Sequence, residues 1–512
     1  KMKKISAIYA FMLCLFFLSK PALLCANTMT PTTGTIDLTD SGGVAQLNFA
    51  AGSTLYIRVE DSDQNTSIST AETISASISS ETETVSENVT LTETGVSTGI
   101  FTASISFAEA SAASGDGILQ VQKGDKLTGS YIDPSDDFGN EKTVIDIAFY
   151  GVSLKSGTIS TSTIWTKANS PYLITGDVTV NENKTLTIEA GVEVRFVAIS
   201  DDQNDGDDLN RSELRIRGRL DAIGTETDSI IFVSNSETPA AGDWYGIRVY
   251  ESGSRATLQY CRMEHNTYGV HASGWNSGYN QDIRVENSLF QNGGIALYQS
   301  NGAYRDVYFN DNTVINADAV GWNDRCNYAE ITNNIIQNGK IYITSDYSTG
   351  DVIKISNNIM TLDESYQSSD PMIDSYPTAI NTHMYQQSSD VMTIVTDNEI
   401  RGPFGYGISV NGYSGGASHS SATIERNTID RIYYRGISVY SLSNIIIKNN
   451  NINRSGFESC WKCNQNSYSG IYISTNNSTN IDMVSNVIDS SGSWGIYASQ
   501  TVGIIDSNVV TN

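Results

Sequence analysis

Two stretches, Ile331-Thr332-Asn333-Asn334-Ile335-Ile336 and Ile355-Ser356-Asn357-Asn358-Ile359, carry the phrase that decides the fold. An apolar residue is followed by polar residues that include asparagine, and an isoleucine or valine then resumes the apolar pattern. The phrase occurs nine times, with marker asparagines at Asn287, Asn312, Asn334, Asn358, Asn398, Asn427, Asn450, Asn486 and Asn508. Successive markers are 22 to 40 residues apart, and most steps are 22 to 25. This period indicates a solenoid in which each repeat is one coil and loops lengthen some repeats.

A second phrase lies between the asparagine marks. It places glycine beside a β-branched residue, as in Tyr268-Gly269-Val270, Arg435-Gly436-Ile437 and Gly470-Ile471-Tyr472. Short β-branched segments favour strands over helices. Asparagine and glycine accept the left-handed backbone that a sharp corner between strands requires. Each coil is therefore expected to contain two short strands joined by tight corners.

The two phrases together resemble the right-handed parallel β-helix of the pectate-lyase-like superfamily, with extracellular repeats of the PbH1 type. The resemblance covers residues 158–512 and implies a ladder of stacked asparagine side chains along one corner. The segments 186–192, 214–220 and 230–233 are similar to the first coils of such proteins. This fold hosts lyases, hydrolases, epimerases, esterases and adhesins, so the resemblance implies the architecture and leaves the activity open.

Residues 1–26 have the pattern of a signal peptide. Lys1, Lys3 and Lys4 precede the apolar run 5–18, and Ala26 ends a plausible cleavage site. The protein is therefore expected to be secreted or displayed on a bacterial cell surface, with no transmembrane segment beyond the signal peptide. The last residues stop in mid-coil without a capping element, so the chain is expected to be a fragment that lacks an anchor or a further module.

The composition is strongly acidic. The 512 residues include 31 Lys and Arg against 57 Asp and Glu, for a formal net charge of −26. Nucleic acid is excluded as a partner because its phosphates would be repelled over most of the surface. Acidic polysaccharide would also be repelled unless cations bridge the two charges. Calcium is a natural partner for so many carboxylates, and a solvated acidic surface is the alternative.

Residues 27–150 lack the asparagine phrase and have a different pattern of apolar and polar residues. The segments 52–59 and 102–107 alternate apolar and polar residues, which indicates a half-buried antiparallel sheet. We expect an immunoglobulin-like β-sandwich here. The segments 59–65, 91–101 and 124–133 resemble a module of bacterial surface proteins, and this resemblance implies a spacer or an adhesive unit. The whole protein is thus expected to be all-β.

Two groups of aspartates are predicted to bind calcium. Asp61 and Asp63 alternate with Asn65, so one face of an extended segment carries oxygen ligands that Asp133 in a second loop could approach. The second group is Asp201, Asp205 and Asp207, within a loop whose five carboxylates in eight residues would repel one another without a cation. The alternatives are turn-forming residues in the first case and a flexible acidic loop in the second.

Catalytic candidates are few because no catalytic phrase of the β-helix enzymes that we considered is present. His271 follows Val270 and is expected to point outward from its strand, where it would be exposed. Trp322, Asp324, Arg325 and Arg401 are expected to border a groove along the coils. If the protein is an enzyme, a polysaccharide lyase acting in that groove is the expected activity.

Aromatic residues in polar loops provide the predicted ligand-binding set. Trp275, Trp322 and Trp461 are expected to stack on sugar rings, and the alternative is that these rings cap the coils. Cys460 and Cys463 flank Trp461 and Lys462 in an inserted loop and are expected to form a local disulfide in an exported protein.

The predicted function is non-catalytic binding of an extracellular polysaccharide or surface glycan, or surface adhesion. The alternative is a carbohydrate-active enzyme, either a polysaccharide lyase or a glycoside hydrolase, that acts in a groove along the β-helix. A structural spacer is the third possibility. An enzyme should show converging carboxylates and basic groups, a binding protein should show a row of aromatic rings, and a spacer should show neither.

Overall fold

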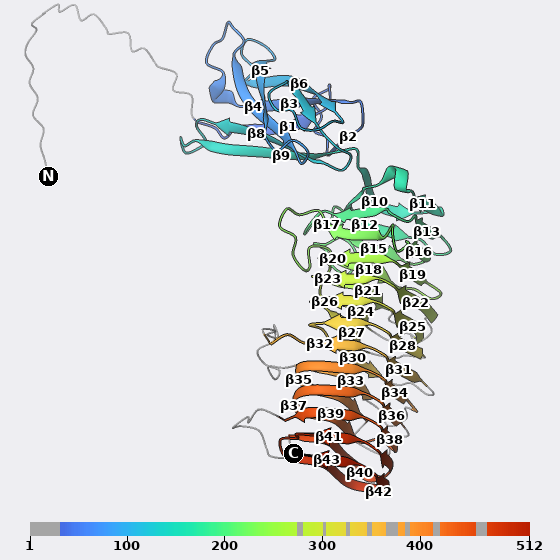
Figure 1. The fold of residues 1–512 in the computed structure, drawn as a ribbon. Coiled ribbons are helices and arrows are strands. Elements are labelled where there is room, and N and C mark those ends of the chain that lie inside the picture. The colour runs from blue at the N-terminus through green and yellow to red at the C-terminus, as the bar shows by residue number, and fades with distance from the viewer. Residues whose placement is uncertain are drawn as a thin grey trace, which may run out of the picture. The chain divides into compact units, whose positions relative to one another are not determined.

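A computed structural model of the chain describes residues 31–273, 280–300, 304–323, 328–345, 351–364, 377–384, 390–412, 420–456 and 468–511. The predicted signal peptide and the cysteines Cys460 and Cys463 lie outside these residues. The chain divides into two compact units, Lys1–Tyr150 and Gly151–Asn512, which are shown in Figure 1. Within the described residues, no helix has the length and apolar character needed to cross a bilayer.

The first unit is a single hydrogen-bonded sheet, mostly antiparallel, with the strand order β1-β3-β6-β5-β4-β8-β9-β2 and with β7 beside β6. The elements are β1 (Thr35–Thr39), β2 (Asn48–Phe49), β3 (Thr54–Glu60), η1 (Ser62–Gln64), β4 (Thr73–Ser80), β5 (Glu87–Glu93), β6 (Ile100–Ala108), β7 (Ile118–Gln120), β8 (Lys126–Asp133) and β9 (Lys142–Tyr150). The sheet curls so that β1 comes close to β9: the N–H of Leu38 in β1 donates to the carboxylate of Asp146 in β9 at 2.7 Å.

Residue alternation explains this sheet. In β3, Leu55, Ile57 and Val59 are fully buried, while the residues between them are not. The expected antiparallel sheet is therefore confirmed. The strands form one continuous path rather than two separately paired sheets.

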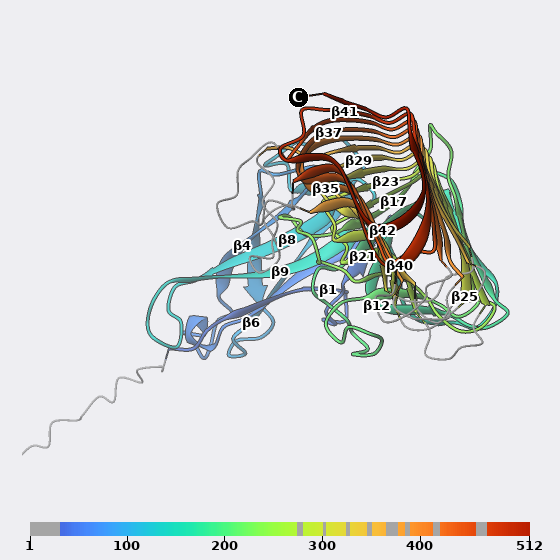
Figure 2. The ribbon, with the colours of Figure 1, turned by 90° about the horizontal axis from the view of Figure 1, so that it is seen from below.

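The second unit is a parallel β-helix. Most coils in the described residues have three strands. Each strand pairs in parallel with its counterpart in the next coil, as β22 (Asn280–Glu286), β25 (Tyr304–Asn310) and β28 (Tyr328–Thr332) do. In the last coils one strand can span two faces, as β35 (Glu399–Asn411) does. Figure 2 looks along this stack. The expectation of two strands per coil was wrong for the three-stranded coils, because the very short strand that follows the repeated asparagine forms a third face of the β-helix.

The strands of the β-helix form three faces, which we call A, B and C. β10 (Ser153–Ile159) and β12 (Tyr172–Val180) run from face C to face A, and η2 (Lys167–Asn169) precedes β12. Face A continues with β15 (Glu213–Ile216), β18 (Gly246–Val249), β21 (Tyr268–Ser273), β24 (Ile295–Ser300), β27 (Asp318–Asn323), β30 (Ile341–Ser345) and β33 (Thr378–Met384). It ends with the second parts of β35 (Glu399–Asn411) and β37 (Thr428–Tyr440) and the first parts of β40 (Ser469–Val484) and β42 (Trp494–Asp506).

Faces B and C complete each coil. Face B contains β11 (Thr163–Trp165), β13 (Thr185–Ile188), β16 (Arg219–Ile223), β19 (Arg255–Gln259), β22 (Asn280–Glu286), β25 (Tyr304–Asn310), β28 (Tyr328–Thr332), β31 (Val352–Ser356), β34 (Met392–Thr396), β36 (Ser421–Glu425), β38 (Asn444–Lys448) and the second parts of β40 and β42. Face C contains β14 (Glu193–Phe196), β17 (Ile230–Ser234), β20 (Cys261–Glu264), β23 (Leu289–Gln291), β26 (Thr313–Ile315), β29 (Ile335–Gln337), β32 (Ile359–Thr361), β39 (Asn451–Ser455), β41 (Val487–Asp489), β43 (Val509–Thr511) and the first parts of β35 and β37.

The asparagine ladder lies at the corner between faces B and C. Asn358 is typical: its backbone N–H donates to Oδ1 of Asn398 at 3.0 Å, and its Nδ2 donates to the carbonyl oxygen of Ile331 at 2.9 Å. Asn358 Oδ1 in turn accepts the N–H of Asn334 at 3.0 Å. Each ladder residue therefore satisfies buried backbone groups of its neighbours, which would otherwise cost stability.

The residue before each ladder position makes the turn. Asn333 and Asn357 have φ values of 59° and 56° in the left-handed region, which asparagine tolerates better than most residues. One predicted marker was wrong: Asn287 is such a turn residue, with φ 50°. Ser288 occupies the ladder position instead, where its N–H donates to Oδ1 of Asn312 at 3.0 Å.

The glycine of the second phrase marks the corner where face C turns into face A. A Cβ on Gly436 would lie 2.5 Å from Cγ2 of Ile452 and 2.8 Å from the carbonyl oxygen of Gly470. Gly407 is equally crowded, by the carbonyl oxygen of Gly436 and by Ile429. The residue at this corner must be glycine-sized, because consecutive coils approach too closely there for a larger side chain.

We expect Asn358→Ala to destabilise the second unit by about 2–4 kcal/mol, because it leaves the N–H of Asn334 and the carbonyl of Ile331 buried without partners. Denaturant unfolding of the full chain measures this loss. Asn444→Ala is the matched control, because Asn444 is exposed on face B. Equal effects of the two substitutions would contradict the account.

Candidate functional site

Face A carries a column of outward-facing residues in register from coil to coil. His271, for example, pairs with Arg248 in the preceding coil and with Tyr298 in the next. Its neighbours Val270 and Ala272 are in the core, and side chains on a strand alternate between the two sides. This outward column is Arg215, Arg248, His271, Tyr298, Gly321, Tyr342, Asn381, Ser409, Ser438, Tyr472 and Tyr497.

The long insertions in the repeat border this same face. Residues 362–377 precede β33 and residues 385–391 follow it, which accounts for the 40-residue step. Residues 412–420 follow the face A part of β35, and residues 456–468 precede β40. In the coils from Ser288 onward, the corner between faces B and C stays short, because the ladder fixes it. Variable loops around a constant scaffold are typical of binding sites.

The first coils of face A contain a buried network of carboxylates and arginines. Asp177 accepts the N–H of Glu213 at 2.8 Å and lies 3.4 Å from Nη1 of Arg215. Glu213 accepts N–H groups of Asp207 and Asp208 and lies 3.9 Å from Nη1 of Arg248. The pKa values of Asp177 and Glu213 are both raised to about 7, mainly by burial, and for Asp177 also by the nearby charge of Glu213.

The acidic loop packs onto this network. Asp205 and Asp207 each bond to an arginine of the outward column, Arg215 and Arg248, at 2.7 Å. Asp201 instead accepts three backbone N–H groups, from Asp177, Gln203 and Asp205. Within the described part of the chain, these aspartates do not form a group with metal-ligand spacing. The arginines and the backbone N–H groups therefore relieve the electrostatic repulsion among these aspartates, on which the prediction of a calcium site in this loop rested.

Gly206 shows how closely the loop fits. Its φ is 88°, and a Cβ at this position would lie 2.5 Å from Oε1 of Glu213 and 2.7 Å from Oδ2 of Asp177. The loop therefore covers both carboxylates, and any larger residue would force it away from the face.

His271 points away from the core, as expected, but the prediction that it is exposed was wrong. The residue is only 4% exposed. Its Nδ1 lies 2.8 Å from the hydroxyl of Tyr245, and its Nε2 lies 2.8 Å from Oγ of Ser300. The rings of Tyr268 and Tyr298 each have centroids 5.0 Å from the imidazole. Neighbouring side chains on the same face bury the histidine.

Two sets of tyrosine rings lie further along face A. Tyr268 and Tyr298 are stacked with centroids 4.5 Å apart and an interplanar angle of 12°. Near the other end, Tyr472 and Tyr497 are stacked at 4.8 Å and 8°, and the guanidinium of Arg435 lies 3.6 Å from the centroid of Tyr472. These four tyrosines are partly exposed, so their rings are accessible to a ligand.

The two groove candidates whose strands the structure describes, Arg401 and Trp322, lie on different faces. Arg401 lies on the face C part of β35, where it pairs with Glu399 at 2.5 Å, whereas Trp322 belongs to β27 of face A. The side chain of Trp322 is outside the described residues, as are Asp324, Arg325, Trp275 and Trp461. The face A tyrosines were missed, although the sequence contained a signal: Tyr472 and Tyr497 each follow the inward isoleucine of the glycine phrase.

In the first unit, the structure does bring the predicted aspartates together. One carboxylate oxygen from each of Asp61, Asp63 and Asp133 lies within 4.8 Å of the others. Asp61 and Asp133 are buried, and the hydroxyl of Tyr131 donates to Asp61 at 2.7 Å. Burial and the neighbouring carboxylates raise the pKa of Asp61 to about 7. Oδ1 of Asp63 and Oδ1 of Asn65 are buried without a hydrogen-bond partner.

Comparison with known proteins agrees with this architecture. Residues 157–297 match the family model of a pectate-lyase like beta helix domain. The matched segment begins in β10, ends in β24 and contains the carboxylate network. No curated protein sequence matches the chain.

Comparison with solved structures found distant similarities. The periplasmic alginate epimerase AlgG is 12% identical over 73% of this chain and 85% of its own, with a TM-score of 0.40. The catalytic unit of a GH87 alpha-1,3-glucanase from Streptomyces thermodiastaticus is 13% identical over 94% and 96%, with a TM-score of 0.30. The Family 28 exopolygalacturonase of Yersinia enterocolitica is 9% identical over 94% and 98%, with a TM-score of 0.19. At these identities the likeness concerns the fold alone.

Proposed function

We propose that the protein binds a glycan chain along face A of the β-helix. The observation that carries this proposal is the outward column, which contains four partly exposed tyrosine rings and one partly exposed amide: Tyr298, Tyr342, Tyr472, Tyr497 and Asn381. Aromatic rings bind the C–H faces of sugars, and the polar groups between them can bond to sugar hydroxyls. A column that follows the coil stack suits an extended polymer.

The expected setting is outside the cytoplasm, on the basis of the predicted signal peptide at residues 1–26. We propose that the first unit is an immunoglobulin-like module of the kind found in bacterial surface proteins, with a role as a spacer or an adhesive unit. Its support is the alternating antiparallel strands and the resemblance of segments 59–65, 91–101 and 124–133.

We expect Tyr472→Ala to weaken binding by about tenfold, because it removes one ring of the stacked pair on which a sugar would pack. Affinity electrophoresis of the full chain in gels that contain different polysaccharides would first identify a retained glycan and then measure the loss. Tyr308→Ala is the matched control: Tyr308 also lies beside an arginine, Arg284, but on face B. The proposal fails if no polysaccharide retards the protein or if both variants lose affinity equally.

Catalysis is a second candidate, favoured by one specific observation. The hydroxyl of Tyr245 lies 2.8 Å from Nδ1 of His271 and 3.3 Å from Oδ2 of Asp207, whose Oδ1 bonds to Arg248 at 2.7 Å. A histidine between two hydroxyls can take up a proton from one side and release it on the other. Arg248 is paired with Asp207, but its positive charge beside the histidine would still favour the negative charge that develops on a uronate during β-elimination.

An absorbance assay for unsaturated product over a panel of uronate polymers tests this candidate. If the protein is a lyase, His271→Gln should lower the rate by about 100-fold or more, while His265→Gln, in the turn between β20 and β21, should not. Product formation that survives His271→Gln would exclude this histidine from the chemistry. If no polymer of the panel yields unsaturated product, glycan binding remains the proposed function.

We also propose that calcium binds at Asp61, Asp63 and Asp133. Calcium accepts irregular sets of oxygen ligands, and a cation here would relieve the repulsion among three close carboxylates. The unpartnered oxygens of Asp63 and Asn65 would supply ligands from the same loop.

Calcium at about 100 times its dissociation constant should stabilise the first unit by about 2.7 kcal/mol. Thermal unfolding of the full chain with calcium and with a chelator measures this difference. Asp63→Asn should remove most of it, whereas Asp40→Asn, a turn carboxylate on the same unit, should retain it. An unfolding curve that is identical with calcium and with chelator would refute the site.

A further inference from the structure

The first unit contains a cavity of about 440 Å³ at the place where β4 and β8 separate. These strands pair from Ala76 opposite Tyr131 to Ser80 opposite Leu127. Beyond Ala76, β4 remains paired with β5 as far as Thr73, while β8 remains paired with β9. The sheet therefore splits, and the cavity occupies the opening.

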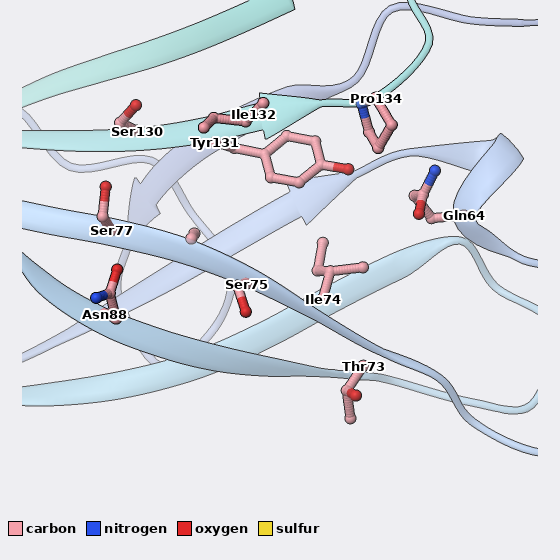
Figure 3. Close-up of a pocket in the computed structure, with 11 residues that line it drawn as sticks. Gln64, Thr73, Ile74, Ser75, Ser77, Asn88, Ser130, Tyr131, Ile132 and Pro134 are labelled. Atoms are coloured by element: carbon pink, nitrogen blue, oxygen red, sulfur yellow. The ribbon is translucent and has the colours of Figure 1, made fainter. Parts of the chain in front are cut away.

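Figure 3 shows how the lining residues surround this opening. Tyr131 and Pro134 come from β8 and the residue after it, Ile74 and Ser75 come from β4, and Gln64 comes from η1. Polar atoms thus reach the cavity from elements that are far apart in the sequence.

The lining is uncharged, which is unusual for so acidic a protein. It offers four hydroxyl groups and two amides together with an apolar part of equal extent, and none of the residues that line the cavity carries a charge. The polar side chains are those of Thr73, Ser75, Ser77, Ser130, Gln64 and Asn88, and the apolar part comes from Ile74, Ile132, Pro134 and the ring of Tyr131. Ile132 is 56% exposed, although most apolar side chains of this unit are in the core.

This chemistry selects among ligand classes. A charged ligand would leave water for a site that offers it no counter-charge, which is costly. A purely apolar ligand would leave the hydroxyl and amide groups without partners. An uncharged polyol meets both conditions, because its hydroxyls can bond to the serine, threonine and amide side chains while its C–H groups pack on Ile74 and Ile132. The volume lies within the range of small-molecule sites, roughly 300–1,000 Å³.

We propose that this cavity binds a short segment of an uncharged oligosaccharide. The site is separate from face A of the β-helix and does not depend on the function proposed there. It would give the protein a second glycan contact on its first unit, so that one chain could hold a polymer at two places.

The cavity is held open by buried contacts. The hydroxyl of Tyr131 donates to Oδ2 of Asp61 at 2.7 Å, and the backbone N–H of Gln64 donates to Oδ1 of the same carboxylate at 3.4 Å. Asp61 is only 2% exposed. One buried carboxylate therefore fixes both an aromatic wall and one end of the cavity, which lowers the ordering cost of binding.

Isothermal titration of the full chain with cellohexaose, maltohexaose and laminarihexaose tests the proposal, with hexagalacturonate as the charged comparison. At least one uncharged hexasaccharide should bind, and hexagalacturonate should not bind at this site. Ser77→Arg and Ser130→Arg should each weaken the affinity by about tenfold or more, because each adds a long charged side chain to the lining. Gln64→Ala, which adds no bulk, should weaken it severalfold. Ser104→Arg is the matched control, on the exposed side of β6 in the same sheet.

The same titrations with Tyr472→Ala separate this site from face A. Binding that survives Tyr472→Ala and is lost in Ser77→Arg supports the cavity, whatever happens to polysaccharide retention on face A. Binding that is lost in Tyr472→Ala but unchanged in Ser77→Arg and Gln64→Ala would overturn the inference while leaving the face A proposal intact. The inference is also overturned if no uncharged hexasaccharide binds the unmodified chain.

Discussion

The hydrogen bonds between stacked asparagines are the constraint on which the β-helix depends. A tight corner inside a solenoid buries backbone N–H and C=O groups that no strand pairing can satisfy, and each of these would cost stability if left alone. Asn334, Asn358 and Asn398 satisfy them from coil to coil with bonds of 2.8 to 3.0 Å. In the coils that carry the ladder this corner keeps a constant length, so length variation there falls at the two corners beside face A.

Much of this fold could be predicted from the sequence, because its constraints are local and periodic. The ladder asparagines and Gly436 lie at two different corners that recur from coil to coil, so each residue type recurs in the sequence at a regular spacing. The third strand of each coil could not be seen, because three residues directly after an asparagine show no alternation. Ser288 was also hidden, since the choice between two adjacent polar residues depends on which of them takes the left-handed backbone.

The sites were less predictable, because they depend on contacts between distant parts of the chain. Asp205 and Asp207 look like cation ligands in sequence, but Arg215 in the strand after the loop and Arg248 in the next coil form ion pairs with them. His271 was correctly placed on the outer side, yet Tyr245 and Ser300 bury it. Conversely, the closeness of Asp61, Asp63 and Asp133 was predicted, because two short loops at one end of a sheet meet readily. The face A tyrosines were overlooked in favour of tryptophans in loops.

Hydrogen–deuterium exchange of the full chain, with and without a glycan that it retains, tests the central claim most directly: one corner holds the coils while face A binds. The account predicts that backbone amides at the asparagine corner exchange slowly in every coil in both states. It also predicts that added protection on glycan binding appears in the face A strands, such as β24 and the first part of β40, and not in face B strands such as β25. Fast exchange at the asparagine corner, or new protection confined to face B, would contradict the account.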